Sequence, residues 1–402
     1  MTDDATMDTP LYDAGKGRRM SMHDLLANFA AHGSLRVSDL HLKAGSPPVY
    51  RVDGALRPLP GEPLDAPTVR ALAGTLLSAN ERAALDRDRA VDSSHLTEAM
   101  QFRLNVFFER DGLAVAVRAL DPEPIPVEEV GFPNDVWRDL IGRQWGLVLV
   151  TGITGAGKST TIASLIARIA ATRPVRVITL EDPIEYRLRG VRGVVSQREV
   201  GRDVPSFARG LRDALREDPD VIFVGEMRDR ESASWTLTAA ETGHLVFSTL
   251  HTRDARGSIT RILDMFPSDQ QDEVANQLSL GLSHILSQKL VPRADGKGRV
   301  AVMEVLTNSY ALANCIRLRK TEQVYSILQT RTRDVPEERM LTMERSLVRQ
   351  VRAGVITALE AETWANHPAV FLDEIKQFTE GQPQGRRPAT RGGGAGRKES
   401  DG

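Results

Sequence analysis

Eight residues, Gly152 to Ser159, have the spacing of a phosphate-binding loop. They read GITGAGKS, a full match to G-x-x-x-x-G-K-[ST]. The glycines let the backbone curl so that its N–H groups point at phosphate oxygens, at a helix N-terminus that favours anions. In such loops the lysine, here Lys158, reaches the β- and γ-phosphates, and the hydroxyl of Ser159 ligates Mg²⁺. The sequence therefore predicts bound ATP and Mg²⁺, with nucleotide contacts from Gly152, Ile153, Thr154, Gly155, Ala156, Gly157, Lys158, Ser159 and Thr160.

Three apolar segments downstream end in side chains that could act on a bound triphosphate. VRVITLEDPIEY presents Glu181, DPDVIFVGEMRD presents Glu226, and HLVFSTLH presents Thr249 and His251, which we expect beside the γ-phosphate. Near one ATP, one carboxylate can hold Mg²⁺ or its waters while the other orients the attacking water. We assign Glu226 to the metal and Glu181 to the water, an order that the sequence leaves open. An ion pair with a local arginine is the alternative for either acid.

His244 and His251 stand seven residues apart, a spacing that would place both on one face of a helix. Val246, Phe247 and Thr249 favour a strand instead. In a strand, an odd separation sends two side chains to opposite faces, and seven residues span roughly 20 Å. A shared metal ion is therefore not expected. His244 begins the strand at its far edge, so a role in nucleotide binding and a role in packing stay equally open.

These residues need a scaffold that brings the ends of several strands together. The loop follows an apolar strand that ends at Val150 or Thr151, and it precedes a helix whose apolar Ile162, Leu165 and Ile169 share one face. The other strands are apolar throughout, as in a parallel sheet covered by helices on both faces. In such sheets ligands gather beyond the carboxyl ends of the strands. The sequence therefore predicts an α/β fold in which the acidic and imidazole groups converge on the phosphates.

A second group of possible phosphate ligands is cationic. The segment QFRLNVFFERDGLAVAVRAL alternates apolar and polar side chains around Asp111–Gly112, which predicts a β-hairpin with that turn. Pairing Arg110 with Leu113 makes Arg103 and Arg118 diagonal neighbours on the polar face, with no obvious acidic partner there. These guanidinium groups could belong to a solvated surface or could bind an external anion. Domain closure over a nucleotide would make them arginine fingers, which contribute about 10³ to 10⁵ in rate.

The composition bounds the class of protein. At 402 residues the chain has room for two or three domains. Its 52 basic and 54 acidic residues give a net charge of -2, which offers no general electrostatic attraction to nucleic acid. A single cysteine, Cys315, excludes an internal disulfide and a multi-cysteine zinc site. No apolar run is long enough to span a bilayer and the start lacks a secretory signal, so we expect a soluble cytoplasmic protein.

Changes in composition divide the chain. Residues 1–20 are polar and are expected to form a disordered N-terminal segment, and residues 376–402 a disordered tail rich in Gly and Arg. ALDPEPIPVEEVGFP, residues 119–133, contains four prolines and is expected to be an extended hinge. It separates an N-terminal domain, 21–118, from a second domain, 134–375, that contains the phosphate loop. The basic tail could bind anionic lipid or nucleic acid, but a solvated tail is the simpler expectation.

The motifs resemble those of the secretion-type hexameric ATPases and, within them, the PilT/PilU-like retraction ATPases of type IV pili. The likeness covers about residues 21–375. SDLHLKAGSPPVYRVDG is similar to the family's PAS-like N-terminal domain, and GITGAGKSTT to its Walker A motif. ITLEDPIEY resembles its Asp box, LREDPDVIFVGEMRD its atypical Walker B motif, and AAETGHLVFSTLHT its His box.

The resemblance implies a PAS-like α+β domain followed by a RecA-like P-loop ATPase domain with C-terminal helices. It also implies a homo-hexameric ring that binds nucleotide between the two domains, assisted by N-domain arginines at the positions of Arg103 and Arg118. His244 belongs to the family's His box and so joins the expected nucleotide-binding residues. The expected function is ATP hydrolysis that powers pilus retraction by turning an inner-membrane platform protein. The ring would lie in the cytoplasm, at the inner face of the membrane.

Several alternatives remain. Extension and secretion relatives usually carry a four-cysteine zinc module and a longer N-terminal region, so a single cysteine favours retraction over pilus assembly or type II secretion. The stretch ALANCIRLR, Ala311 to Arg319, departs from the retraction motif, because Ala313 replaces its first arginine and Leu318 its closing glutamate. An accessory, PilU-like subunit in a hetero-assembly with a paralogous retraction ATPase therefore stays open. A helicase-like motor is a further alternative, but the near-neutral charge argues against nucleic acid as a partner.

Overall fold

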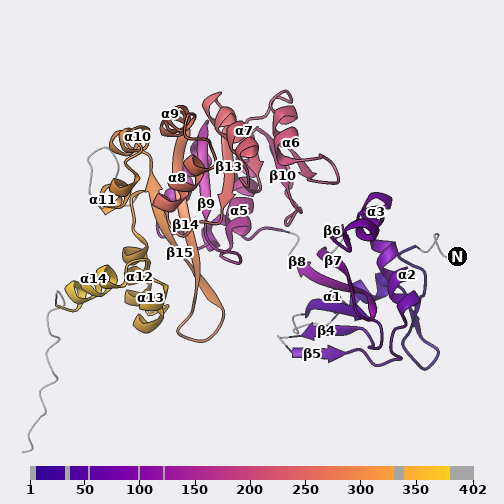
Figure 1. Ribbon diagram of the computed structural model, residues 1–402. Helices are drawn as coiled ribbons and strands as arrows, with labels where there is room; N and C mark the ends of the chain where they lie inside the picture. The colour runs from indigo at the N-terminus through magenta and orange to yellow at the C-terminus, as the bar shows by residue number, and fades with distance from the viewer. Residues whose placement is uncertain are drawn as a thin grey trace, which may run out of the picture.

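The computed structural model describes residues 6–31, 37–52, 55–97, 100–120, 123–329 and 339–380. These residues form two units, each built on its own large sheet (Figure 1). The N-terminal unit holds a six-stranded antiparallel sheet. The larger C-terminal unit holds a seven-stranded sheet that is mostly parallel. The predicted combination of an α+β domain with an α/β domain is confirmed.

The N-terminal unit packs helices on one face of its sheet. Its elements are α1 (Met22–Ala31), β3 (Val37–Lys43), β4 (Val49–Val52), β5 (Ala55–Pro58), α2 (Ala66–Leu76), α3 (Ala79–Asp88), β6 (Ala90–Leu96), β7 (Gln101–Glu109) and β8 (Gly112–Leu120). The strands lie in the order β5-β4-β3-β8-β7-β6. Leu104, Val106 and Val117 are buried in a core shared with α1 and α2. The residues that alternate with them on β7 and β8 face away from this core and are free to form a second, polar surface.

The expected disordered N-terminal segment is wrong for residues 6–20. A short hairpin pairs β1 (Tyr12–Asp13) with β2 (Arg19–Met20), and the side chains of Tyr12 and Met20 are buried in the core of the N-terminal unit. The prediction rested on the average polarity of the segment. It missed that burial of a large apolar side chain stabilises a fold by about 1.5–3 kcal/mol. Residues 1–5 lie outside the described part.

β7 and β8 form the predicted hairpin, but in a different register. The strands pair Glu109 with Gly112, so that Arg110–Asp111, and not Asp111–Gly112, forms the turn. Arg103 therefore lies directly opposite Arg118 and is not diagonal to it. The correction shifts the partners by two residues, which leaves each side chain on the same face of the sheet. Alternation alone could not distinguish the two registers, because a strand repeats every two residues.

The C-terminal unit orders its sheet as β11-β10-β12-β13-β9-β14-β15. Its elements are η1 (Val127–Glu129), α4 (Val136–Gly142), β9 (Gly146–Thr151), α5 (Lys158–Thr172), β10 (Arg176–Glu181), β11 (Val194–Glu199), α6 (Phe207–Ala214), β12 (Val221–Val224), α7 (Arg230–Glu241), β13 (Leu245–Leu250), α8 (Ala255–Asp264), α9 (Gln271–Gly281), β14 (Leu282–Pro292) and β15 (Arg299–Thr307). Neighbouring strands are parallel except β14 and β15. The carboxyl ends of β9, β10, β12 and β13 therefore meet at one edge.

Helices cover both faces of this sheet (Figure 1). Leu147 and Leu149 of β9 belong to one core cluster, together with residues of α6 to α9, whereas Val148 and Val150 belong to a second cluster with α4 and α5. Because neighbouring residues of a strand point to opposite faces, the two clusters are the two sides of the sheet. β9, β12 and β13 are buried at every position. This is the pattern predicted for parallel strands between two helical layers.

The expected domain boundaries shift where the chain packs. β8 continues to Leu120, so residues 119 and 120 belong to the N-terminal sheet. Val127 and Val130, from the expected hinge, are buried in the core of the C-terminal unit. At the other end, α14 (Pro368–Glu380) continues into the expected tail. Residues 381–402 of that tail lie outside the described part. Single apolar side chains that are buried in a core cause these shifts. The average composition of a segment does not reveal such isolated residues.

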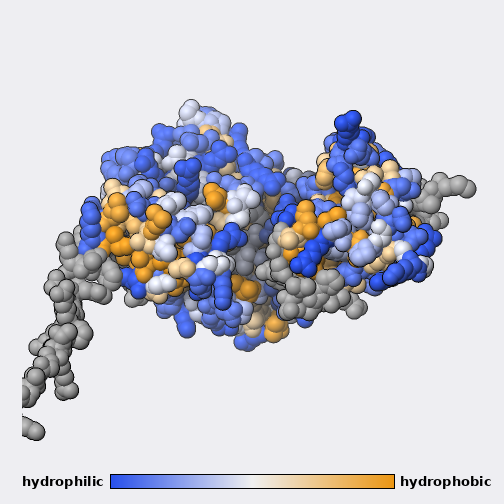
Figure 2. Space-filling view, turned by 90° about the horizontal axis from the view of Figure 1, so that it is seen from below, coloured by the Kyte–Doolittle hydropathy of each residue, from blue (hydrophilic) through white to orange (hydrophobic). Residues whose placement is uncertain are grey.

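The C-terminal helices extend the larger unit beyond its sheet. They are α10 (Tyr310–Arg317), η2 (Thr321–Gln323), α11 (Val324–Gln329), α12 (Met343–Arg352), α13 (Ala358–Trp364) and α14. A separate core cluster joins α12, α13 and α14 to β14 and β15. Hydrophobic side chains gather on the surface at this end of the unit (Figure 2), where Leu359 of α13 and Leu372 of α14 are exposed. None of the helices within the described ranges combines the length and hydropathy that a membrane span requires.

Candidate nucleotide-binding site

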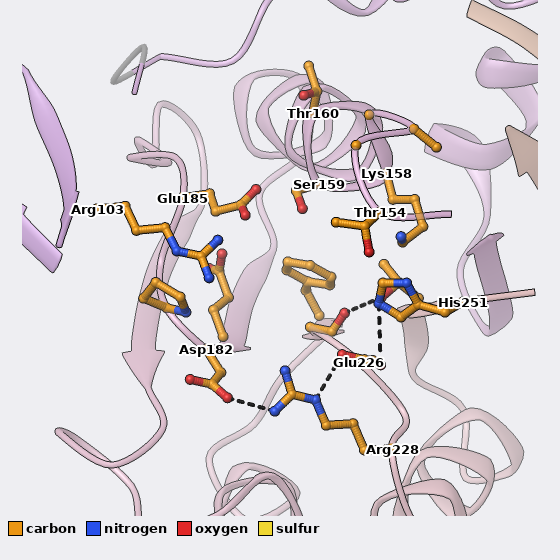
Figure 3. Close-up of a pocket in the computed structure, with 18 of the residues that line it drawn as sticks. Arg103, Thr154, Lys158, Ser159, Thr160, Asp182, Glu185, Glu226, Arg228 and His251 are labelled. Atoms are coloured by element: carbon orange, nitrogen blue, oxygen red, sulfur yellow. Dashed lines mark hydrogen bonds and ion pairs between the residues drawn. The ribbon is translucent and has the colours of Figure 1, made fainter. Parts of the chain in front are cut away.

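A cavity of about 470 Å³ opens at the carboxyl edge of the seven-stranded sheet (Figure 3). The phosphate loop, the ends of β10, β12 and β13, and a side chain of the N-terminal unit form its wall. The structure brings together these sequence-predicted residues: Arg103, Thr154, Gly155, Ala156, Gly157, Lys158, Ser159, Thr160, Glu181, Glu226, Thr249 and His251. The volume lies within the usual range of small-molecule sites, which is about 300–1,000 Å³.

The backbone of the loop requires glycine at its first fixed position. Gly152 has a φ of 148°, and a Cβ atom there would come within 2.4 Å of the carbonyl oxygen of Gln288. Lys158 opens α5, and its Nζ donates to the carbonyl oxygens of Gly152 at 2.9 Å and Ile153 at 3.3 Å. Burial lowers the pKa of Lys158, against the opposing effect of two nearby acids. Gly152 and Ile153 shape the loop from behind, because neither lines the nucleotide cavity.

Gln288 of β14 braces the loop. Its Nε2 donates to the carbonyl oxygen of Ala156 at 2.7 Å, and its Oε1 accepts from Thr161 Oγ1 at 2.7 Å. The side chain is buried, and so is that of Thr161. Both bonds therefore hold the loop to the sheet on the side away from the cavity. Sequence reasoning did not single out Gln288, because it lies between Ser287 and Lys289 and does not stand out from the other polar residues of β14.

Glu181 ends β10 as a buried acid. Thr179 Oγ1 donates to its Oε1 at 2.6 Å, and Gln197 Nε2 donates to the same oxygen at 3.1 Å. Burial raises the pKa of Glu181 to about 7, although these hydrogen bonds lower it. A carboxyl group that titrates near neutral pH can accept a proton and release it again. The surroundings of Glu181 therefore suit a general base.

Glu226 follows β12 and lies in a chain of ion pairs (Figure 3). Its Oε2 accepts from Arg228 Nε at 2.8 Å, and its Oε1 lies 3.4 Å from His251 Nε2. The Nη1 atom of Arg228 donates to Asp182 Oδ2 at 2.9 Å. Glu226 therefore makes the ion pair with a local arginine that was the alternative, and it also lines the cavity as expected. The pairs fix the Glu226 carboxylate beside the imidazole of His251.

The oxygen atoms of this wall suit a hard cation. The Ser159 hydroxyl makes no hydrogen bond to any described residue, and Glu226 and Glu185 add carboxylates to the same wall (Figure 3). Mg²⁺ takes one or two carboxylate oxygens from a protein and completes its shell with phosphate oxygens and water. The donor chemistry therefore fits Mg²⁺ beside a bound triphosphate.

The two arginines of the N-terminal unit have different surroundings. Arg103 of β7 points its guanidinium group into the cavity beside Glu185 (Figure 3). Arg118, directly opposite on β8, does not line the cavity, and its Nε donates to Asp39 Oδ1 at 2.8 Å. The expectation that Arg118 lacks an acidic partner is wrong. Asp39 pairs with Arg118 across β3 and β8, a pairing of distant segments that the hairpin pattern could not reveal.

The two remaining candidates from β13 have different positions, since Thr249 lines the cavity and His244 does not. His244 lies at the amino end of β13, opposite to the cavity, where its Nδ1 is 3.0 Å from the carbonyl oxygen of Ala239. The structure thus places His244 away from the nucleotide cavity, where it packs at the turn after α7. Thr249 lines the cavity, and its Oγ1 donates to the carbonyl oxygen of Gly225 at 2.6 Å. That bond ties the end of β13 to the end of β12.

Sequence reasoning left other residues of the wall without a role. Asp182 and Arg228 follow strand ends, so the rule that selected Glu181 and Glu226 could have included them. The segments ITLEDPIEY and LREDPDVIFVGEMRD also contain Pro183, Glu185, Phe223 and Gly225, which sequence reasoning did not select. The remaining wall residues, from segments without any motif, are Phe207, Leu290 and Arg299.

Comparison with known proteins gives concordant results. The family model for type II/IV secretion system proteins matches residues 38–352. The chain is 39% identical over 353 residues to the type IV pilus retraction ATPase PilT of Pseudomonas aeruginosa, covering 88% of this chain and 100% of the relative. It is 34% identical over 370 residues to the type IV pilus ATPase PilU of the same organism, covering 87% and 96%. The crystal structure of the pilus retraction motor PilT with bound ADP matches with a TM-score of 0.79 at 43% identity, covering 87% and 98%.

Proposed function

The chain belongs to the type II/IV secretion system protein family and is an ATPase, and from that membership we propose that it powers retraction of a type IV pilus. The observation that carries the proposal is the cavity in which a phosphate loop, two acids, a histidine and an arginine of the other unit meet. The likeness to a retraction ATPase over that relative's whole length supports retraction over pilus assembly.

The proposed hydrolysis uses groups of this chain around the γ-phosphate. The N–H groups of the loop and Lys158 bind the phosphates. Mg²⁺, held by Ser159 and Glu226, would neutralise phosphate charge when bound. Glu181 orients the attacking water and accepts its proton as the new oxygen–phosphorus bond forms and the bond to the β–γ bridging oxygen breaks. The products are ADP and phosphate. His251, paired with Glu226, would respond to the γ-phosphate from the end of β13.

We further propose that closure of the N-terminal unit over ATP positions Arg103. Contacts between the units support this: Ser94 Oγ donates to Glu199 Oε2 at 2.8 Å, and Gln101 Nε2 donates to the carbonyl oxygen of Ile184. These residues come from β6 and β7 on one side and from the segments around β10 and β11 on the other. Hydrolysis would release the closed arrangement, so that rigid-body motion of one unit against the other performs work.

The assembly is part of the proposal. Six copies would form a ring on the cytoplasmic face of the inner membrane, where the ring turns a pilus platform protein. A paralogous retraction ATPase is a possible member of a hetero-assembly, and nucleic acid is not an expected partner. The resemblance to retraction ATPases motivates this arrangement, and the relatives' names are consistent with a motor of the pilus.

Lys158→Ala tests the proposed function. Loss of the ammonium group should abolish ATP hydrolysis by the purified protein and twitching by cells together, whereas Lys297→Ala, an exposed lysine of the β14–β15 turn, should change neither. Deletion of the gene should leave cells with more surface pili that do not twitch. Bald cells would show that the motor extends pili, and normal twitching of Lys158→Ala cells would refute a principal retraction role.

An accessory role is the second candidate. Leu318, at the position where the retraction motif ends in glutamate, is 52% exposed at the end of α10. An altered surface at that motif favours a subunit that works with a paralogue. In that case the Lys158→Ala protein should still support twitching, and co-purification with the paralogue should survive the substitution.

A further inference from the structure

A second cavity, of about 390 Å³, shares the phosphate loop with the nucleotide cavity but none of its lining residues. Gly152 and Ile153 line it, at the start of the loop, whereas the nucleotide cavity begins at Thr154. The rest of its wall comes from three places: Arg253 and Asp254 after β13, Gln288 and Lys289 of β14, and residues 363–367, the end of α13 and the turn before α14. Three segments distant in the sequence thus enclose a space directly behind the loop.

The wall contains a buried donor without an acceptor. Lys289 Nζ donates to the carbonyl oxygen of Trp364 at 2.6 Å and to Asn366 Oδ1 at 2.7 Å. An ammonium group has only donors, so this contact fixes the orientation of the Asn366 amide. Its Nδ2 is left buried and without a hydrogen-bond partner among the described residues. A buried donor without an acceptor destabilises the folded protein, and an acceptor in the cavity would remove that cost.

Positive charge without a protein partner lies beside this donor. Arg253 is exposed at the cavity and makes no ion pair or hydrogen bond to any described residue. Lys289 uses two of its three N–H groups on the α13–α14 turn. Three acids lie near Lys289, and each accepts a hydrogen bond from a backbone N–H; Glu304 Oε1 accepts from the N–H of Ala255 at 2.8 Å. Asp254 Oδ1 accepts from the N–H of Gly257 at 2.6 Å, and Glu344 Oε1 accepts from the N–H of His367 at 2.8 Å.

We propose that this second cavity binds a small anion through its carboxylate or phosphate oxygens, held by Arg253, the Nδ2 of Asn366 and Lys289. The guanidinium group supplies the charge and the geometry of a forked donor. The amide and the ammonium group supply directed donors deeper in the wall. The volume admits a molecule larger than a single phosphate ion, so the anionic group is one part of the ligand.

The position of the cavity couples it to the nucleotide. Gln288 and Lys289 are consecutive residues of β14, so their side chains point in opposite directions. Gln288 holds the loop through Ala156 and Thr161, while Lys289 holds the α13–α14 turn. A ligand that moves Lys289 or presses on Ile153 therefore acts on the loop through a short rigid path. Binding at the two cavities is expected to be linked, and such linkage is reciprocal.

Calorimetry tests the site with two probes, malonate for a carboxylate ligand and inorganic phosphate for a phosphate ligand. Each is titrated into the full-length protein saturated with Mg²⁺ and AMP-PNP, so that the phosphate loop is already filled. We expect one probe molecule per chain, with a dissociation constant at roughly millimolar level or below. Arg253→Gln should weaken binding about ten-fold or more, and Asn366→Leu should do the same. Arg256→Gln, an exposed arginine of α8 outside the cavity, is the matched control.

Linkage is read from the affinity for a fluorescent ADP analogue with and without the better probe. We expect a shift of about five-fold or more in wild-type protein, and no shift in Arg253→Gln. Absence of binding by both probes, or binding that Arg253→Gln leaves unchanged, would overturn the proposal. Because Arg253 is exposed, its substitution does not put folding at risk. The titration measures binding without turnover, so its outcome is separate from whether the protein retracts a pilus.

Discussion

Asp39 in the N-terminal unit and Glu181 in the C-terminal unit are both buried acids, and their surroundings move their pKa values in opposite directions. Burial acts to raise the pKa of Asp39, but hydrogen bonds from Ser38 and Arg118 outweigh it, and the pKa is lowered. Glu181 has only neutral donors, and burial raises its pKa to about 7. Asp39 is therefore held in its charged form as an ion-pair partner. Glu181 has a pKa near neutral pH, so it can gain and lose a proton there.

The same difference separates the two arginines that face each other on β7 and β8. Arg118 is neutralised by Asp39, whereas Arg103 reaches into the nucleotide cavity. Asp39 also lies 3.7 Å from Arg51 Nε, so its ion pairs help to hold this part of the sheet, whereas the guanidinium group of Arg103 is left for the other unit. Two arginines that lie directly opposite each other on neighbouring strands thus divide between structure and chemistry, because only Arg118 is paired with Asp39.

Substitution of the two arginines is the strongest way to test this division. Arg103→Gln should lower the ATPase rate about 10³-fold, the lower end of the effect of arginine fingers, because the charge that reaches the transferred phosphate is lost. Arg118→Gln should affect the rate far less, since its guanidinium group is occupied by Asp39. Steady-state hydrolysis at saturating ATP measures both.

Equal losses from the two substitutions would mean that Arg118 leaves Asp39 when nucleotide binds. A normal rate for Arg103→Gln would show instead that closure of the N-terminal unit does not assist hydrolysis. Thermal unfolding of each variant serves as the control for folding.

The residues of the C-terminal unit were the easier to predict. The motif of the phosphate loop is local, and strands that are apolar throughout identify a parallel sheet, whose carboxyl ends share one edge. This one rule predicted that Glu181, Glu226 and His251 lie together at that edge. The same rule also predicted that His244 lies at the far edge of the sheet, and only the motif resemblance added it to the expected nucleotide-binding residues.

The N-terminal unit was harder because its contacts are between distant segments. The pairing of β3 with β8 brings Asp39 to Arg118, although 79 residues separate them. The hairpin register was ambiguous by two residues, because a shift of two residues leaves every side chain on the same face of the sheet. Gln288 was hidden for a similar reason, because its partners Ala156 and Thr161 lie on a loop and a helix far from β14 in the sequence.

Glu181→Gln gives the next largest expected effect and tests whether the buried acid of the C-terminal unit acts as a base. The amide cannot accept a proton, so the rate at neutral pH should fall about 10²-fold or more. In wild-type protein the rate should rise with pH through about 7, because the carboxylate is the active form of a base. The variant should lose that rise.

Asp39→Asn is the matched control for this experiment, because it removes a buried carboxylate from the other unit. It should keep both the rate and the pH profile within a small factor of wild type. A pH dependence near 7 that persists in Glu181→Gln would assign the titration to another group and would remove Glu181 from the role of base.

The smallest effect is on stability, and Asp39→Asn reveals it. The variant loses the ion pair with Arg118 and should unfold with a free energy about 2 kcal/mol lower at neutral pH, as expected for a hydrogen bond to a charged group. Because the folded pKa of Asp39 lies below its ordinary value of 3.8, wild type holds this advantage above that pH and loses it as the pH falls through the folded pKa. Urea unfolding of both proteins at neutral and acidic pH measures the difference, with Asp92→Asn, an exposed acid of β6, as the control. An advantage that is the same at every pH would mean that packing, and not the charge of Asp39, holds β3 to β8.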